Sequence, residues 1–256
     1  MKKFLVIGLG VMVIGVIAII VLAILNLGTI VKTATETYGP RITKTEVRLG
    51  SADISILSGS GALNNFFLGN PEGFSMPSAL ECKTIWVKVV KESLATDTIV
   101  IEEIIVDGPI VSYERRGNTD NFKTILNNIN QTVASEKKTA PAEQEATGAE
   151  KTIQINNFIV KNGRINVGGS LLDAFGADKG VGIALPDIHM KDIGKDKKTT
   201  PAEAFAQVLA EMTGDVAGTV TQLGRELSKT LGKAMEGASE GAKSLGSTVK
   251  GLFGSE

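Results

Sequence analysis

The sequence predicts an α+β protein with an N-terminal transmembrane helix, a curved antiparallel β-sheet with a short covering helix, and C-terminal amphipathic helices. Three observations lead to this fold class. An uncharged apolar run covers residues 4–27. Several short segments then alternate apolar and polar residues with a period of two, as half-buried strands do. Finally, apolar residues recur every three or four positions in residues 122–133 and again after residue 200, as on one face of a helix.

The apolar run Phe4–Leu27 contains no charged residue and no proline. It exceeds the roughly 20 apolar residues that a helix needs to cross a bilayer core. Two lysines lie within residues 1–3, so the positive-inside rule places these residues in the cytoplasm and the chain from residue 28 on the far side. The alternative is a cleaved signal peptide, whose apolar region has about 7 to 15 residues and ends at a small-x-small site. Residues 25–27 offer no clean site, so we expect an uncleaved anchor.

Composition disfavours several classes of function. The net charge of −1, the pI of about 6.0 and the single tryptophan give no basic or aromatic surface for nucleic acid. Cys82 is the one cysteine, so no intrachain disulfide forms, and we expect it to be a small buried hydrophobe. His189 is the one histidine, which cannot supply the ligands of a zinc site. Since a Walker motif is also missing, we predict no enzyme and assign no catalytic, metal or cofactor residue.

Strands are expected in residues 42–57, 84–90, 98–106, 110–113, 152–161, 165–167 and 182–190. Gly50-Ser51 and Asp107-Gly108-Pro109 predict bends, and Pro186 breaks the last strand. Asn162-Gly163 predicts a two-residue hairpin turn. Because these turns are short and no long helix is expected between strands, the sheet is predicted to be antiparallel. We divide it into a β domain with its helix at 28–133, a polar flexible linker at 134–150 and a continuation at 151–194.

Two helical regions follow from pattern and capping. The stripe within residues 122–133 predicts a short helix that Asn118, Thr119 or Asp120 caps. Thr200-Pro201-Ala202-Glu203 predicts a helix start with a capping box, and Gly214 a helix end. The amphipathic tail spans residues 200–256, and its apolar face from residue 215 consists of Val216, Val220, Leu223, Leu227, Leu231, Leu245, Val249 and Leu252. Its recurring glycines predict a helix that forms against a surface, either the sheet, a sister chain or the membrane.

Several segments resemble the AsmA-like proteins, a family related to AsmA and TamB. The run 68–75, LGNPEGFS, resembles the NP-x-GF element of that family; residues 93–104 and 108–114 resemble the strands that follow, and 121–122 the start of the next helix. The motif residues are Asn70, Pro71, Gly73, Phe74, Ser93, Leu94, Gly108, Pro109, Tyr113, Glu114 and Asn121. The resemblance covers about residues 1–133, and residues 185–194 are similar to C-terminal segments of short members. The chain lacks the many repeats of the large relatives.

The resemblance implies a protein anchored by a single pass in the bacterial inner membrane, with the bulk of its chain in the periplasm. It implies a curved sheet whose apolar concave face accommodates phospholipid, in lipid transport or outer-membrane homeostasis. The candidate groove residues are Ile54, Ile56, Ile85, Val87, Ile99 and Ile101.

The strand at 98–106 fits a groove, because alternation places Ile99, Ile101 and Ile105 on one face and Val100, Ile104 and Val106 on the other. A sheet covered on both sides by its own helices predicts the same pattern. The alternative function is a non-enzymatic scaffold that docks partners, a sister chain or the membrane through its C-terminal helix, without lipid cargo.

Overall fold

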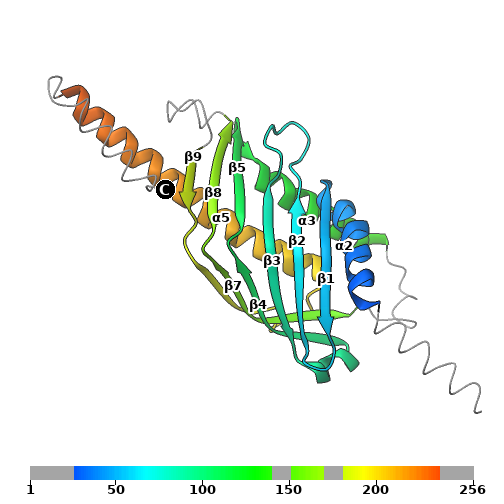
Figure 1. The fold of residues 1–256 in the computed structure, drawn as a ribbon. Coiled ribbons are helices and arrows are strands. Elements are labelled where there is room, and N and C mark those ends of the chain that lie inside the picture. Colours follow the sequence, from blue (N-terminus) through cyan, green and yellow to red (C-terminus); the bar gives the residue numbers. More distant parts are fainter. Residues whose placement is uncertain (1–25, 140–150, 170–180, 237–256) are drawn as a thin grey trace, which may run out of the picture.

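The structure is a computed structural model that describes residues 26–139, 151–169 and 181–236. It is α+β, with one 10-stranded sheet and helices on one face and one edge of it (Figure 1). The helices are α2 (Leu27–Thr43), the 3-10 helix η1 (Lys91–Ala95), α3 (Asn121–Thr139) and α5 (Pro201–Glu236). The strands are β1 (Val47–Ser55), β2 (Ser60–Leu68), β3 (Leu80–Val89), β4 (Thr98–Asp107), β5 (Ile110–Arg116), β6 (Thr119–Asp120), β7 (Thr152–Lys161), β8 (Arg164–Gly169), β9 (Val181–Ala184) and β10 (Ile188–Ile193).

Within the described ranges, no helix is both long and apolar enough to cross a membrane. The predicted anchor falls almost entirely on residues 1–25, outside those ranges. The described chain begins instead with α2, where the sequence pattern had suggested a strand from residue 42.

The sheet is mixed, so the prediction of an antiparallel sheet was wrong. β4 pairs with β7, and β5 with β8, in parallel, while the other pairings are antiparallel. A parallel pair needs a long crossover, and α3 with the residues after it supplies one between β5 and β7. The helix runs 19 residues to Thr139, beyond the expected end at residue 133. The helix therefore occupies the first residues of the predicted linker 134–150.

Asn162-Gly163 does not form a hairpin. β7 continues past it as β8, just as β4 continues past Gly108-Pro109 as β5. In both strand pairs the parallel partner keeps the same register before and after the interruption. β9 and β10 form a third pair of this kind, interrupted at Pro186 as the sequence predicted. Each pair is therefore one long strand with a bend.

The bends share one line across the sheet. On β1 and β2, the pairs Leu49–Phe66 and Ser51–Asn64 leave one unpaired residue in each strand, as do the pairs on either side of Asn65 and Lys83 between β2 and β3. Further across the sheet the interruption widens to two residues per strand and then to three between β7–β8 and β9–β10, at the same level. The residues on this line, which we call the pivot row, are Gly50, Asn65, Lys83, Gly108, Asn162 and Pro186. Three of them, Asn65, Gly108 and Asn162, have φ of 53°, 65° and 55°. β1 thus runs through Gly50 as one strand, where two had been expected.

The pivot row resets the alternation of each strand. Cys82 and Ile85 are an odd number of residues apart, yet both belong to or pack on the same core, and the same is true of Val111 and Val106. In an uninterrupted strand, residues at odd spacing point to opposite faces. Left-handed residues make this change at Asn65, Gly108 and Asn162, whereas Lys83, between Cys82 and Ile85, has no positive φ. In each case the same face of the strand points toward the core on both sides of the pivot row. We call this the inner face and the opposite one the outer face.

Helices α3 and α5 cover part of the inner face and pack on each other (Figure 1). Asp120 caps α3, because its carboxylate accepts the Lys123 N–H at 2.8 Å. The predicted capping box of α5 is confirmed: the Thr200 N–H donates to the Glu203 carboxylate (2.9 Å), and the Glu203 N–H to the Thr200 hydroxyl (3.3 Å). The predicted end at Gly214 was wrong, since α5 continues for 36 residues in all. Apolar burial on both sides of Gly214 outweighs the roughly 1 kcal/mol that a glycine costs a helix.

Helix α2 lies along the free edge of β1. Glu36 accepts the Leu49 N–H at 3.1 Å, and the Lys32 ammonium donates to the Gly50 carbonyl at 3.0 Å. Gly28 and Gly39 allow the close approach, because a methyl group at either position would collide with β1. An exposed strand edge is a site for unwanted pairing with other chains, and α2 blocks this one.

Candidate functional site: the apolar inner face of the distal half

The pivot row divides the sheet into two halves. The distal half comprises residues 51–64, 84–107, 152–161 and 188–193, and the covered half comprises residues 47–49, 66–82, 110–116, 164–169 and 181–185. In the covered half, inner-face residues such as Leu49, Leu68, Val111 and Ile165 are almost completely buried. The distal half differs in the residues that its inner face carries and in how far they are covered.

Apolar residues form three rows across the inner face of the distal half. Because paired residues in a sheet share a face, the strand register gives each row directly. The first row is Ile54, Gly61, Val87, Ile104, Phe158 and Met190. The second is Ala52, Leu63, Ile85, Val106, Val160 and Ile188. The third is Val89, Ile101, Ile155 and Ile193. None of these positions carries a charged or hydrogen-bonding side chain.

Burial of the rows falls from one side of the sheet to the other. On β7, Phe158 and Val160 are buried, where α5 packs on β7 and β10. On β3 and β4, Val87 and Ile104 are half-buried. On β1, Ile54 is 37% exposed. In the second row, Ala52 and Val106 are buried as well. The other apolar side chains of the rows on β1 to β4 are half-buried or, at Ile54, exposed, so the surface is apolar throughout and only partly covered there.

The structure brings five of the six predicted groove residues onto this face. Ile54, Val87 and Ile85 belong to the first two rows and Ile101 to the third. Ile99 pairs with Ile153, which packs on the core, and so shares the face. The sixth, Ile56, lies past the end of β1 in the turn to β2 and is half-buried. Sequence reasoning missed Leu63 and Met190 because it predicted no strand at β2 and no pairing partner for β10.

One detail of the predicted alternation in β4 was wrong. Ile101 and Ile104 share the inner face, although their spacing is odd. A β-bulge causes this, because the β3–β4 register shifts between Lys88, which pairs with Glu103, and Val89, which pairs with Ile101. An extra residue in one strand reverses its alternation from that point. Ile105, which the alternation had grouped with Ile99 and Ile101, lies instead on the outer face beside Trp86.

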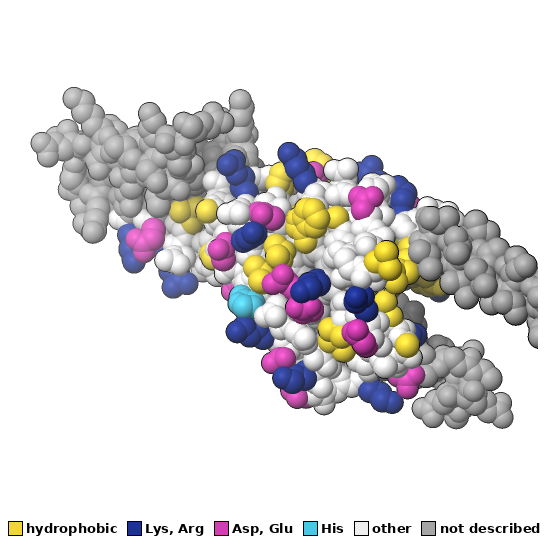
Figure 2. Space-filling model, turned by 60° about the horizontal axis from the view of Figure 1, so that its bottom comes forward, with side chains coloured by type: hydrophobic (Ala, Val, Ile, Leu, Met, Phe, Trp, Pro, Cys, Tyr) yellow, Lys and Arg dark blue, Asp and Glu magenta, His cyan; other side chains and the backbone are white. Residues whose placement is uncertain are grey.

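The outer face of the distal half is mixed in character. Trp86 is 56% exposed and pairs with Ile105. The Lys88 ammonium lies 2.9 Å from the Glu102 carboxylate, and both side chains are exposed. Figure 2 shows this end of the molecule, where apolar side chains are scattered among basic and acidic ones. The continuous apolar rows thus distinguish the inner face from the outer one.

Several residues of the segments that resemble AsmA-like proteins, called the motif residues above, meet at the opposite end of the sheet, in the covered half. The Asn121 amide donates to the side-chain oxygen of Asn70 and to the carbonyl of Ser112, each at 2.7 Å. Its own oxygen accepts the Glu114 N–H at 3.1 Å. Asn70 in turn donates to the carbonyls of Met76 (2.7 Å) and Ser78 (2.9 Å), which lie in the loop between β2 and β3. The network joins that loop to β5 and to the start of α3.

Glu114 holds the same loop with its carboxylate. It accepts the backbone N–H groups of Ser75 (2.8 Å) and Met76 (2.9 Å) and the Ser75 hydroxyl (2.9 Å). Arg116 donates to the carbonyl of Gly73 in the same loop. Among the described residues, no buried side-chain nitrogen or oxygen lacks a hydrogen-bond partner. We interpret this network as structural, since its polar atoms are occupied by one another.

The other motif residues have separate places. Tyr113 is buried, and its hydroxyl lies 3.4 Å from the Asp120 carboxylate; burial and this neighbour raise the pKa of Tyr113 to about 12. Gly108-Pro109 forms a bend of the pivot row. Ser93 caps the turn of η1, because its hydroxyl donates to the Val90 carbonyl (2.6 Å) and accepts the Val100 N–H (2.9 Å). The remaining motif residues, Pro71, Phe74 and Leu94, make no polar side-chain contact and lie in the β2–β3 loop and in η1.

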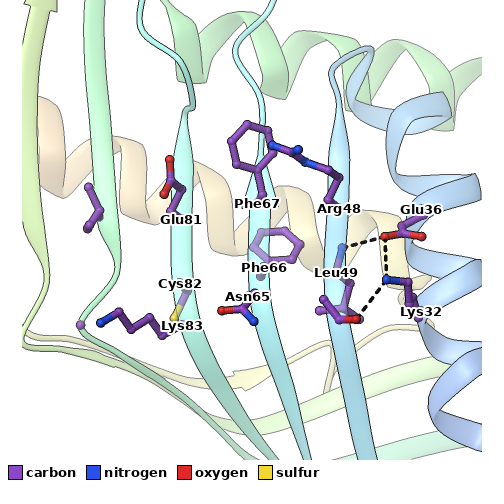
Figure 3. Close-up of a pocket in the computed structure, with 13 residues that line it drawn as sticks. Lys32, Glu36, Arg48, Leu49, Asn65, Phe66, Phe67, Glu81, Cys82 and Lys83 are labelled. Atoms are coloured by element: carbon purple, nitrogen blue, oxygen red, sulfur yellow. Dashed lines mark hydrogen bonds and ion pairs between the residues drawn. The ribbon is translucent and has the colours of Figure 1, made fainter.

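A shallow hollow of about 460 Å³ lies over the pivot row beside α2 (Figure 3). Lys32 and Glu36 line one side of the hollow. They form an ion pair of 3.5 Å beside the edge of β1. Arg48 lies 4.0 Å above the ring of Phe67. Cys82 is buried at the base, as predicted, and burial raises the pKa of its thiol, which disfavours the reactive thiolate. The ion pair and hydrogen bonds of Lys32 and Glu36 fasten α2 to the edge of β1, and we assign this side of the hollow a structural role.

The predicted tail face is only partly described. Val216, Val220 and Leu223 are buried in the same helix as the capping box, so this part of the stripe packs inside the molecule. Leu227 and Leu231 lie in α5, but their side chains fall outside the described part. Leu245, Val249 and Leu252 lie beyond residue 236 and are likewise outside it.

His189 is exposed on β10, with a ring nitrogen 3.1 Å from the Asn157 side-chain oxygen. In the described ranges, no three His, Cys, Asp or Glu side chains are grouped as metal ligands. Comparison of the chain with protein-family models, with curated proteins and with solved structures finds no match in any of the three. The AsmA-like resemblance therefore rests on the motif residues of the sequence alone.

Proposed function

We propose that this protein is anchored in the bacterial inner membrane and handles phospholipid in the periplasm, in lipid transport or outer-membrane homeostasis. The inner face of the distal half is the surface that would contact acyl chains. The observation that carries the proposal is the set of three apolar rows whose members on β1 to β4 are half-buried or exposed, apart from the buried Ala52 and Val106. The proposal assigns no catalytic residue.

The chemistry of the rows favours an acyl chain over a polar ligand. Leaving apolar side chains in water costs roughly 25 cal/mol per Å², and an amphiphile that covers them recovers this free energy. A polar ligand would need hydrogen-bonding partners, which the side chains of the rows lack. Strands lie about 4.8 Å apart, so the face from β1 to β4 is about 15 Å wide. That is too short to bridge an envelope, so the protein would act next to the inner membrane or as one module of a larger assembly.

The direct test is photo-crosslinking in membranes that contain the full chain. A benzophenone amino acid at Ile54, on the inner face, is compared with the same residue at Asp53, its neighbour on the outer face. Both positions are exposed and lie at the same level of the sheet. We expect phospholipid adducts, detected by mass spectrometry, at position 54 and few at position 53. Equal yields at both positions, or none at 54, would contradict a lipid-binding inner face.

A second candidate is the scaffold function, which the length of α5 favours. Figure 1 shows α5 extending past the edge of the sheet at β9. A truncation for this test should end at Glu226, because Val216, Val220 and Leu223 belong to the buried interior and must be kept. Loss of a bound protein partner, with unchanged lipid adducts at position 54, would favour the scaffold. Loss of the lipid adducts with partner binding retained would favour the lipid function.

A further inference from the structure

Two leucines at one end of the distal half are exposed to solvent. Leu57, in the turn between β1 and β2, is 90% exposed, and Leu94, in η1, is 40% exposed. The turn residues 56–59 and η1 are neighbours, because the Val89 N–H donates to the Gly59 carbonyl at 2.7 Å. We call this end, residues 56–59 and 91–95, the tip. An isolated exposed leucine needs no explanation, but two on adjacent loops at one end form a candidate contact surface.

A lysine braces each of these loops. The Lys91 ammonium donates to the carbonyl of Leu57 at 3.0 Å. The Lys151 ammonium donates to the carbonyls of Leu94 (2.8 Å) and Thr96 (3.1 Å). Each exposed leucine therefore has a cation next to its own backbone. Apolar side chains beside lysines are the combination that suits the interface between lipid headgroups and acyl chains.

The start of α2 indicates what could cover the tip. Three contacts show how α2 lies along β1: Gly39 faces Val47, Glu36 binds the Leu49 N–H, and Gly28 faces Ala52. Helix α2 thus runs antiparallel to β1, and its first residues lie beside the part of β1 that leads to the tip (Figure 1). A strand rises about 3.3 Å per residue, so Leu57 lies within roughly 17 Å of Ala52 along the chain. The apolar run 4–27 joins the described chain at this point.

We propose that the tip rests in the headgroup layer of the bilayer that holds the run 4–27. Leu57 and Leu94 enter the interface, and Lys91 and Lys151 lie at the level of the lipid phosphates. Glu92 and Asp97 are also near the tip, so apolar insertion and not net charge provides the attraction. This contact would hold the uncovered ends of the apolar rows next to the lipid. The inference rests on the membrane anchor of the proposed function, but not on lipid cargo.

The test uses the full chain in proteoliposomes, with Cys82→Ala so that each variant carries one cysteine. An environment-sensitive fluorophore is attached at Leu57→Cys, at Leu94→Cys or at the control Asn118→Cys. Asn118 is exposed in the turn between β5 and β6, at the opposite end of the sheet. Lipids with a nitroxide on the acyl chain quench fluorophores that enter the bilayer. We expect loss of emission at positions 57 and 94 and none at 118.

Unquenched emission at both leucine positions, or quenching at 118 as strong as at 57, would overturn the proposal. Extraction of the same vesicles at alkaline pH separates the two hypotheses. If the chain is released by the extraction, the anchor itself fails. If the chain stays in the membrane while position 57 remains unquenched, the anchor holds and only the contact of the tip is wrong.

Discussion

The two halves of the sheet share strands but differ in how their inner faces are covered. In the covered half, Val111, Ile165 and Val167 are fully buried, and the Asn121 network fixes the loop between β2 and β3. In the distal half, β4 is half-buried along almost its whole length. The contrast indicates a division of labour, in which the covered half provides stability and the distal half keeps apolar surface available.

The largest expected difference between the halves is in how much an alanine substitution on the inner face lowers the free energy of unfolding. Ile165→Ala removes a fully buried side chain and should lower the free energy of unfolding by about 4 kcal/mol. Ile54→Ala removes one that is 37% exposed, with an expected cost below about 1 kcal/mol. Denaturant unfolding of both variants measures the contrast. Equal costs would mean that the distal half is as well packed as the covered half.

A smaller effect is expected from the motif network. Asn121→Ala removes the hydrogen-bond partner of the Glu114 N–H, the Ser112 carbonyl and the Asn70 side-chain oxygen. The free energy of unfolding should fall by about 3 kcal/mol. Asn64→Ala is the matched control in the distal half, because its bonds to Ser51 and Asp53 are exposed and the bond it accepts from the Thr84 hydroxyl (3.2 Å) leaves a hydroxyl that is only half-buried. The control should stay within about 0.5 kcal/mol of wild type. A neutral Asn121→Ala variant would refute a structural role for the network.

Alkaline pH should weaken the covered half through Tyr113. The unfolded tyrosine loses its proton near pH 10, whereas the folded pKa is about 12, so the folded state binds the extra proton between these values. The contribution of Tyr113 to the free energy of unfolding is therefore fully present below pH 10. It falls by about 2 kcal/mol as the pH rises toward 12. Tyr113→Phe should lack this part of the slope. Parallel pH profiles for wild type and variant, measured by chemical unfolding, would contradict the assignment.

The smallest effect concerns the pivot row between the halves. Asn162 has φ of 55°, where a β-carbon costs roughly 1 kcal/mol unless the side chain compensates. Its amide donates to Asp107 at 2.8 Å, and this bond, with Lys161 nearby, holds the pKa of Asp107 below its usual value. Asn162→Ala should lower the free energy of unfolding by about 1 kcal/mol, and Asn162→Gly by less. Both variants lose the hydrogen bond to Asp107, but glycine adopts a positive φ without steric cost. Equal losses would show that φ at this position carries no cost.

The sequence predicted those elements whose signals are local. The capping box at Thr200, the stripe of α3 and the bends at Gly108-Pro109 and Pro186 all depend on residues a few positions apart. β2 was missed because Asn65 turns the chain in its centre and interrupts the alternation. The parallel pairing was missed because it depends on a crossover of about 40 residues, which leaves no local pattern.

The candidate site shows the same limit. Five of the six candidate groove residues, chosen for their apolar character, share the inner face of the sheet. The assignment of Ile101 and Ile104 to opposite faces failed, since the bulge opposite Lys88 and Val89 is a property of the β3–β4 register. The packing of α5 on β7 and β10 could not be predicted either, because a helix start at Thr200 does not show which strands the helix will contact.

The most direct test of the central claim compares two valines on the inner face, one in each half. Val87→Cys and Val111→Cys are made separately in the full chain with Cys82→Ala, and the rate of reaction with a small maleimide is measured under native conditions. Val87 is half-buried and Val111 fully buried. The account predicts that position 87 reacts in the folded protein and that position 111 reacts only as the protein unfolds. Equal protection of both positions would show that the distal inner face is filled.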